Sequence, residues 1–244
     1  MAIWVAGVVC AIAFGTLALG DYFAGEAREF SPLPATAHPA DPASDPPPPL
    51  AAVFWSGDMG MHVGFGSDLP ERLARAGVPV LAVSSPVVFG HERTADEARG
   101  EVAASLADAI NRSGAQRVAL IGFSFGADVV AASVGNLPPG LRRRIAQVVL
   151  VGPGKGIHFH ANPFGLFYLG RSDADPAAAA AGLRGIPTSC IFASAEADDS
   201  LCREPGLAKA RLTEIADGHM MLAHREEVTG AVIAAVLHPP EPLP

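Results

Sequence analysis

An apolar run that ends in Gly-x-Ser-x-Gly constrains this chain more than any other stretch. Residues 118–121 read Val-Ala-Leu-Ile, the pentapeptide occupies residues 122–126, and a helix-compatible pattern follows. A strand, a sharp turn and a helix in this order form a nucleophile elbow with Ser124 at its tip. Gly122 and Gly126 suit that turn because side chains there would collide across the bend. With 26 glycines in the chain the pentapeptide alone is weak, so the flanking strand and helix carry the prediction.

Apolar runs that suit buried strands alternate with helix-like stretches along the chain. We expect strands at Ala51–Trp55, Val78–Val83, Arg117–Ile121, Gln147–Val151, Thr188–Ala193 and Arg211–Ile215. We expect helices at Leu69–Ala76, Thr94–Ile110, directly after Ser124 and at Glu226–Leu237. This alternation predicts an α/β fold with a mainly parallel sheet and helices on both faces. A stretch rich in Gly, Phe and His at about 152–181 breaks the alternation, and we interpret it as a small insert over the site.

The first 22 residues have the composition of a signal peptide or a membrane anchor. Residues 1–20 are nearly all apolar, carry no charged side chain and, as a helix, are about long enough to span a bilayer. They lack the Lys/Arg-rich start of a typical signal peptide. Arg28 is the only base near the end of this apolar helix, which leaves little to hold that flank in the cytoplasm. We therefore place the folded part outside the cytoplasm, either secreted or tethered.

Residues 23–50 are predicted to be a proline-rich linker. Prolines occupy positions 32, 34, 39, 42 and 46 through 49, so this stretch suits neither a helix nor a central strand. It should run as an extended, semi-rigid spacer. The folded domain is accordingly expected to cover residues 51–240, starting near Ala51.

Charge and residue usage exclude some kinds of function. The formal net charge is −8 and the basic residues form no stripe, which argues against binding to nucleic acid. His158 and His160 alternate as on a strand, but no nearby Cys or well-spaced carboxylate completes a metal site, so we expect neither a metal nor a cofactor. Cys190 and Cys202 either close a short disulfide, in an oxidising compartment, or are two buried thiols.

Partners for Ser124 follow in the order that a serine hydrolase of this architecture needs, which is an acid and then a histidine. The sequence Glu-Ala-Asp-Asp, residues 196–199, comes after one expected strand, and Asp-Gly-His, residues 217–219, comes after the next. His219 would take the proton of Ser124, and an acid would fix the tautomer of its imidazole. Asp199 is the first choice for the acid, Asp198 the second and Glu196 the third.

An oxyanion hole is expected beside Ser124. Its donors should be the backbone N–H of Phe125 and an N–H from the loop at Gly57 and Asp58. That loop follows the first expected strand of the domain. In open α/β sheets the carboxyl ends of the strands carry the ligand site.

At this level of detail the sequence resembles the bacterial VirJ/AcvB virulence-protein family over roughly residues 51–237. The resemblance is carried by Ser56-Gly57-Asp58 with Gly60, Gly77-Val78-Pro79-Val80, Arg93-Thr94, Leu120 to Val129, Leu137-Pro138, Cys190-Ile191, Asp199-Ser200-Leu201-Cys202 and Gly218-His219. It implies an α/β-hydrolase fold and a periplasmic location. For the AcvB branch it implies hydrolysis of the aminoacyl ester of aminoacyl-phosphatidylglycerol, lysyl-phosphatidylglycerol included. It also implies pairing of Cys190 with Cys202 and favours Asp199 as the acid.

Two departures from the family pattern concern the substrate more than the catalytic groups. The family loop Ser-Gly-Asp-Gly-Gly-Trp here carries Met59 and Met61, and the aromatic pair Phe-Trp is here Phe89-Gly90. The chain resembles the single-domain VirJ form, since AcvB-type proteins often carry an additional related domain. The expected substrate is a phospholipid or a small ester, with membrane contact through the N-terminal segment.

Two other functions stay open at this stage. One is a non-catalytic accessory protein of a secretion or envelope complex, with proteins of that complex as partners, in which the fold serves as a binding scaffold. The other is a general esterase or thioesterase, which shares the chemistry and differs in the pocket.

Overall fold

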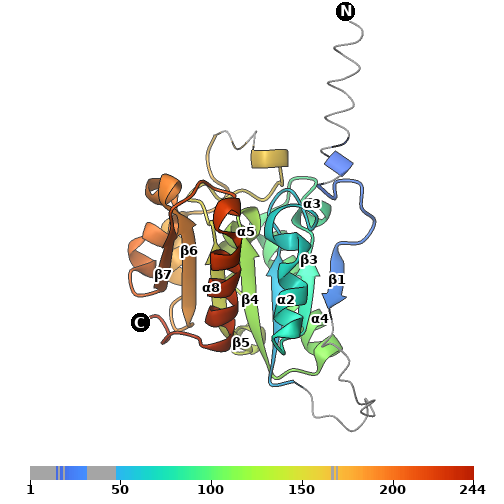
Figure 1. The fold of residues 1–244 in the computed structure, drawn as a ribbon. Helices are drawn as coiled ribbons and strands as arrows, with labels where there is room; N and C mark the ends of the chain where they lie inside the picture. The colour runs from blue at the N-terminus through green and yellow to red at the C-terminus, as the bar shows by residue number, and fades with distance from the viewer. Residues whose placement is uncertain (1–14, 16, 19, 32–47, 166–167, 169) are drawn as a thin grey trace, which may run out of the picture.

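The sheet orders the molecule. The computed structural model describes residues 15, 17–18, 20–31, 48–165, 168 and 170–244. Within them the strands are β1 (Arg28–Ser31), β2 (Leu50–Trp55), β3 (Val80–Val83), β4 (Arg117–Phe123), β5 (Ile145–Val151), β6 (Thr188–Ala193) and β7 (Arg211–Ile215). Their order across the sheet is β1-β3-β2-β4-β5-β6-β7. All neighbours pair in parallel except β1, which runs antiparallel to β3 (Figure 1).

Helices cover both faces of the sheet, as the sequence predicts. The α-helices are α2 (Leu69–Arg75), α3 (Ser85–Val88), α4 (Ala95–Ser113), α5 (Phe125–Val134), α6 (Pro139–Arg142), α7 (Pro176–Gly182) and α8 (Arg225–Leu237). Short 3-10 turns are η1 (Gly64–Ser67), η2 (Pro163–Gly165), η3 (Ser194–Asp199), η4 (Leu201–Arg203), η5 (Pro205–Leu207) and η6 (Leu222–His224). One apolar core joins α4, α5 and α7 to the sheet, and another joins α2 and α8 to its opposite face (Figure 1).

Local sequence explains where these elements begin and end. Residues of β2 after Leu50 are all buried, as expected for a central parallel strand. Helix α4 begins at a capping box in which the Thr94 side chain accepts from the Glu97 backbone N–H and the Glu97 carboxylate accepts from the Thr94 backbone N–H. Gly114 ends the helix in the left-handed conformation, at a φ of 70°.

Strand β1 corrects the predicted domain boundary. Residues 23–50 were expected to form a linker, but Arg28–Ser31 pairs with Val80–Val83 at the edge of the sheet. The Arg28 guanidinium also donates to the Glu101 carboxylate of α4 at 3.0 Å. The pairing satisfies backbone groups that β3 would otherwise leave exposed at a sheet edge. The folded domain therefore includes residues well before Ala51.

The expected signal peptide or anchor falls largely outside the described residues, as do residues 32–47 of the expected linker. Among the residues that the structure does describe, no helix is both long enough and apolar enough to cross a membrane.

Candidate active site

The nucleophile elbow is present as predicted. Strand β4 ends at Phe123 and α5 begins at Phe125, so Ser124 occupies the turn, with φ of 51° and ψ of −122°. A positive φ is rare for a residue with a side chain and indicates strain at a functional position. A Cβ on Gly126 would lie 2.4 Å from the Ser56 carbonyl oxygen, and one on Gly122 would lie 2.5 Å from the Gly126 carbonyl oxygen. Both positions therefore require glycine.

Ser124, His219 and Glu196 form one chain of hydrogen bonds. The Oγ of Ser124 lies 2.7 Å from Nε2 of His219, and Nδ1 of His219 lies 2.6 Å from Oε2 of Glu196. When Nδ1 carries the proton and donates it to the carboxylate, Nε2 is free to accept the proton of the serine. Side-chain exposures of 39% for His219 and 45% for Glu196 leave this pair open to solvent on one side.

The acid in contact with the histidine is therefore Glu196, and the choice of Asp199, with Asp198 as the alternative, is corrected. The backbone carbonyl of Asp199 accepts from the Lys155 backbone N–H at 2.8 Å, and that of Asp198 accepts from the Lys155 Nζ at 2.8 Å. All three acids lie in η3 directly after β6. Glu196 lies at a kink in η3, with a non-helical φ of −120° and ψ of 16°, and its side chain reaches the His219 ring. The two aspartates follow the kink, where their carbonyl groups bind Lys155.

Asp217 shapes the loop that presents His219. Its carboxylate accepts from the Gly218 backbone N–H at 2.8 Å and from the Ala223 backbone N–H at 3.1 Å. The Gly218 N–H holds the pKa of this carboxyl below its usual range. The His219 loop is thus held at the end of β7, facing the elbow.

The Cys190–Cys202 disulfide is present, with Cα atoms 5.7 Å apart. It joins β6 to η4 and closes the segment that carries Glu196. The pairing that the family resemblance implies is thereby confirmed.

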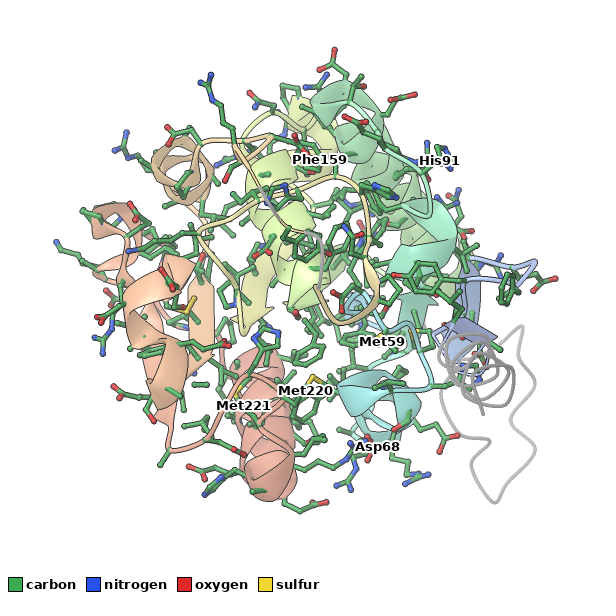
Figure 2. The ribbon with its side chains drawn as sticks, turned by 90° about the horizontal axis from the view of Figure 1, so that it is seen from above. Met59, Asp68, His91, Phe159, Met220 and Met221 are labelled. Carbon is green, nitrogen blue, oxygen red and sulfur yellow. A yellow bond between two sulfur atoms is a disulfide. The ribbon has the colours of Figure 1, made fainter. Side chains whose placement is uncertain are left out.

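A pocket of about 630 Å³ opens over Ser124, His219 and Glu196. The loop at Gly57 lies close to the elbow: a Cβ added to Gly57 would be 3.5 Å from the Ser124 Cβ. The Phe125 backbone N–H has no acceptor among the described residues, as is usual in a first helical turn. The N–H of Asp58 instead interacts with its own carboxylate. Figure 2 looks onto this edge of the sheet, with Met59 and Met220 of the pocket wall near its centre.

Two buried carboxylates lie in the pocket wall. The sequence predicted Asp58 at the site only through its backbone N–H, and it did not predict Asp128. Asp58 is 9% exposed and Asp128 is 8% exposed. Burial raises the pKa of Asp58 to about 6, although the nearby His219 opposes this. Burial also raises the pKa of the Asp128 carboxyl well above its usual value, against the hydrogen bond from the Gly154 N–H. Asp128 follows Ser124 by four residues, about one turn into the helix after the elbow, and this spacing is a signal from which the sequence could have predicted it.

Residues 152–156, Gly165 and Tyr168, which lie between β5 and α7, line one side of the pocket. Helix α7, within the predicted insert at 152–181, begins at Pro176. Tyr168 stacks between His158 and Phe125, with ring centroids 5.0 and 6.2 Å away. Its hydroxyl lies 3.4 Å from Oδ2 of Asp58. Among the described residues no group of three or more His, Cys, Asp or Glu side chains could hold a metal ion.

The N-terminal segment fastens the loop that carries Asp58. Asp21 is 5% exposed, and its Oδ2 accepts from the Met61 backbone N–H at 2.6 Å and from the Ser84 hydroxyl at 2.8 Å. The Tyr22 hydroxyl donates to the Asp58 carbonyl oxygen at 2.9 Å. Burial raises the pKa of the Tyr22 hydroxyl, which keeps this donor protonated. The residues that follow the apolar N-terminus are thus part of the wall behind the site.

These features define the class of protein: a mainly parallel sheet, an elbow serine and a histidine after the last strand make an α/β-hydrolase fold. Est1E from Butyrivibrio proteoclasticus matches with 15% identity over 86% of this chain and 92% of its own, at a TM-score of 0.58. The thioesterase domain from the curacin biosynthetic pathway matches with 12% identity over 78% of this chain and 91% of its own, at a TM-score of 0.55. Dienelactone hydrolase from Anabaena variabilis matches with 15% identity over 78% of this chain and 87% of its own, at a TM-score of 0.52. At such identities the likeness concerns the fold.

The family follows from the sequence. The bacterial virulence protein (VirJ) family matches residues 50–238, so this chain belongs to that family. No curated protein has a sequence that matches the chain.

Proposed function

We propose that this protein is a serine hydrolase that cleaves a carboxylic ester with Ser124 as nucleophile. The observation that carries the proposal is the hydrogen-bond chain from Ser124 through His219 to Glu196 beneath a strained turn. A nucleophile, a base and a group that orients the base are what acyl transfer requires. The similarity to esterases and a thioesterase supports the same kind of reaction.

The reaction proceeds in two balanced halves. The Oγ of Ser124 attacks the ester carbonyl while its proton passes to Nε2 of His219. The carbon–oxygen bond to the alcohol then breaks, and the leaving oxygen takes the proton from His219. Water attacks the acyl-Ser124 ester next, gives one proton to His219 and releases the acid, and that proton returns to Ser124. The Glu196 carboxylate stabilises the imidazolium in both halves.

The negative oxygen that forms in each half needs donors that are already in place. The free N–H of Phe125 at the start of α5 is one, and the positive end of the helix adds to it. The loop at Gly57, which packs against Ser124, is placed to supply the second. The Asp58 N–H is the weaker choice because its own carboxylate engages it.

We further propose that the substrate is the aminoacyl ester of aminoacyl-phosphatidylglycerol, lysyl-phosphatidylglycerol included, and that the protein acts in the periplasm, secreted or tethered by its N-terminal segment. The resemblance of the sequence to the AcvB branch of the VirJ/AcvB family supports the substrate. The acidic pocket suits an acyl group that carries an ammonium. The disulfide supports a compartment outside the reducing cytoplasm.

Labelling with a fluorophosphonate probe tests the nucleophile. Wild-type protein should label, Ser124→Ala should not, and His219→Ala should label far more slowly. His224→Ala is the matched histidine control, because His224 contacts Asp217 rather than Ser124, and it should label like the wild type. Well-folded wild-type protein that does not label would sink the proposal and favour a non-catalytic accessory role.

The substrate requires a second assay. Protein that labels should release amino acid from aminoacyl-phosphatidylglycerol in mixed vesicles, and Ser124→Ala should not. Release of no amino acid by protein that cleaves simple esters would restrict the assignment to a general esterase or thioesterase.

A further inference from the structure

Two buried carboxylates face the pocket of Ser124 without belonging to its hydrogen-bond chain. Asp58 and Asp128 both line this pocket, and each is more than nine-tenths buried. A buried carboxylate is costly unless a cation or enough hydrogen-bond donors satisfy it. The chemistry proposed for Ser124, His219 and Glu196 gives neither carboxylate a role.

Only one of the two carboxylate oxygens of Asp128 has a hydrogen-bond partner among the described residues. Its Oδ1 accepts from the Gly154 backbone N–H at 2.8 Å. Its Oδ2 has no hydrogen-bond partner within the described part of the chain, although the side chain is 8% exposed and lines the pocket. The Asp58 carboxylate accepts from the Tyr168 hydroxyl at 3.4 Å, and the backbone N–H groups of Gly165 and Asp58 are its other polar neighbours. These neighbours supply dipoles but no positive charge.

The cations of the pocket are engaged elsewhere. The Nζ of Lys155 donates to the Asp198 carbonyl oxygen at 2.8 Å and lies 3.7 Å from the Glu204 carboxylate. The imidazole of His219 is held between Glu196 and Ser124. Among the described lining residues no arginine is present. The two aspartate carboxylates therefore have no cationic partner among the described lining residues, and a cationic group of a ligand could bind between them.

That position lies close to the reacting centre. Asp128 follows Ser124 by four residues, about 6 Å along a helix axis, and its N–H donates to the Ser124 carbonyl oxygen at 3.2 Å. Asp58 directly follows Gly57, whose backbone packs on the Ser124 side chain. The α-ammonium of an amino acid is two bonds from its carbonyl carbon, whereas the terminal ammonium of lysine is six bonds away. The α-ammonium would therefore lie nearer to the Ser124 elbow than the terminal ammonium, on the side of the chain where both aspartates line the pocket.

We propose that Asp58 and Asp128 bind the α-ammonium group of the amino acid whose ester Ser124 attacks, which makes them specificity-determining residues for aminoacyl esters. This inference rests on the proposed ester hydrolysis and extends it to a recognition site. The apolar side chains of Met59, Phe192 and Met220 line the same pocket and would contact an aliphatic amino-acid side chain. The burial that raises both pKa values would be offset by a bound ammonium, since an opposite charge lowers the pKa of a carboxyl.

Four ethyl esters with the same six-carbon acyl chain test the site. Hexanoate has no amine, norleucine has the α-amine, 6-aminohexanoate has the terminal amine and lysine has both. A hydrogen-bonded charge pair should raise kcat/KM about 10- to 100-fold for norleucine over hexanoate. The 6-aminohexanoate ester should gain much less, and lysine should behave like norleucine.

Variants then locate the preference. Asp128→Asn keeps an oxygen for the Gly154 N–H and removes the charge, so the ratio of norleucine to hexanoate turnover should collapse toward one. Asp58→Asn should lower the same ratio. Asp199→Asn is the matched control, because it removes one charge from the pocket wall without touching the proposed ammonium position. Its ratio should stay at the wild-type value.

Each outcome separates this inference from the proposed function. Wild-type protein that labels at Ser124 and cleaves the hexanoate ester, but shows no preference for norleucine, would overturn the ammonium site and leave the hydrolase proposal standing. The same holds if Asp199→Asn lowers the ratio as much as Asp128→Asn does. An equal loss on all four esters would assign Asp128 a structural role. Failure to label or to cleave any ester would overturn both proposals.

Discussion

Replacing Glu196 by Gln isolates the charge of the acid that contacts His219. The Gln oxygen can still accept from Nδ1–H at the position where Glu196 Oε2 lies 2.6 Å away, so the ring and its tautomer keep their place. The substitution removes only the negative charge that stabilises the imidazolium. Glu196→Gln should therefore slow the reaction without unfolding the site.

The solvent exposure of Glu196 determines how much kcat/KM should fall in Glu196→Gln. Hydrogen bonds to charged groups contribute about 1.5–3 kcal/mol, and the 45% exposure of this side chain places the effect at the lower end because solvent screens the charge. About 1.5–2 kcal/mol corresponds to a fall in kcat/KM of about 10- to 30-fold. This is far smaller than the loss of about 10⁴ known for a buried triad aspartate.

Hydrolysis of p-nitrophenyl butyrate measures the effect, and the rate of fluorophosphonate labelling provides a second readout at Ser124. Asp199→Asn and Asp198→Asn are the matched controls, since both acids share η3 with Glu196 but contact Lys155 through their carbonyl groups. Both should stay within about threefold of the wild type, the scatter of ordinary surface changes.

An unchanged rate for Glu196→Gln together with a large loss for Asp199→Asn would refute the reasoning, because the acid would then be Asp199. A loss near 10⁴ for Glu196→Gln would refute the magnitude, because it would mean that the closed, substrate-bound site buries the acid.

The N-terminal segment should stabilise the domain. Asp21→Ala should lower the free energy of unfolding in urea by about 2–3 kcal/mol, because it leaves the Met61 N–H and the Ser84 hydroxyl without an acceptor. A protein that starts at Ala51 should have a lower melting temperature than one that starts at residue 20. Unchanged stability in both would contradict the docking. Removing the Cys190–Cys202 bridge by double substitution to alanine should lower the free energy of unfolding by about 2–3 kcal/mol, the loop-closure contribution for a separation of 12 residues. It should also slow ester cleavage, because Glu196 lies in the segment that the bridge closes. Ester cleavage at the wild-type rate would argue against that link. The preference for the norleucine ester should be present above pH about 6 and be lost as pH falls through the raised pKa of the Asp58 carboxyl, because an ammonium binds the ionised form. It should also fade above about pH 8, where the α-amine loses its proton; a preference that is flat from pH 5 to 9 would contradict the charge pairing.

The strands and the elbow could be predicted because their signals are local. A fully buried strand such as β6 reads as a continuous apolar run, and its bounds, Thr188–Ala193, match the prediction. The elbow needs glycine on both sides of Ser124, so the sequence pattern itself reports the close approach of the backbone. His219 was found by its order in the chain, since parallel strands bring the loops after β6 and β7 to one edge of the sheet.

Strand β1 escaped prediction because a four-residue edge strand has little pattern of its own. Arg28–Ser31 precedes a run of prolines, and its pairing with β3 depends on backbone groups rather than on side chains. Asp21 likewise shows no local signal, because its partners Met61 and Ser84 are far away in sequence.

The sequence by itself predicted the α/β class, Ser124 at the elbow and His219 after the last strand, because each depends on short-range patterns or on chain order. The pairing of Cys190 with Cys202 came from the family resemblance. Only the tertiary structure decided which of the three neighbouring acids contacts His219. Glu196, Asp198 and Asp199 lie within four residues, and the direction of each side chain depends on how η3 turns after β6. The same holds for Asp58 and Asp128, whose carboxylates meet one pocket because the sheet brings the loop after β2 against the helix after β4.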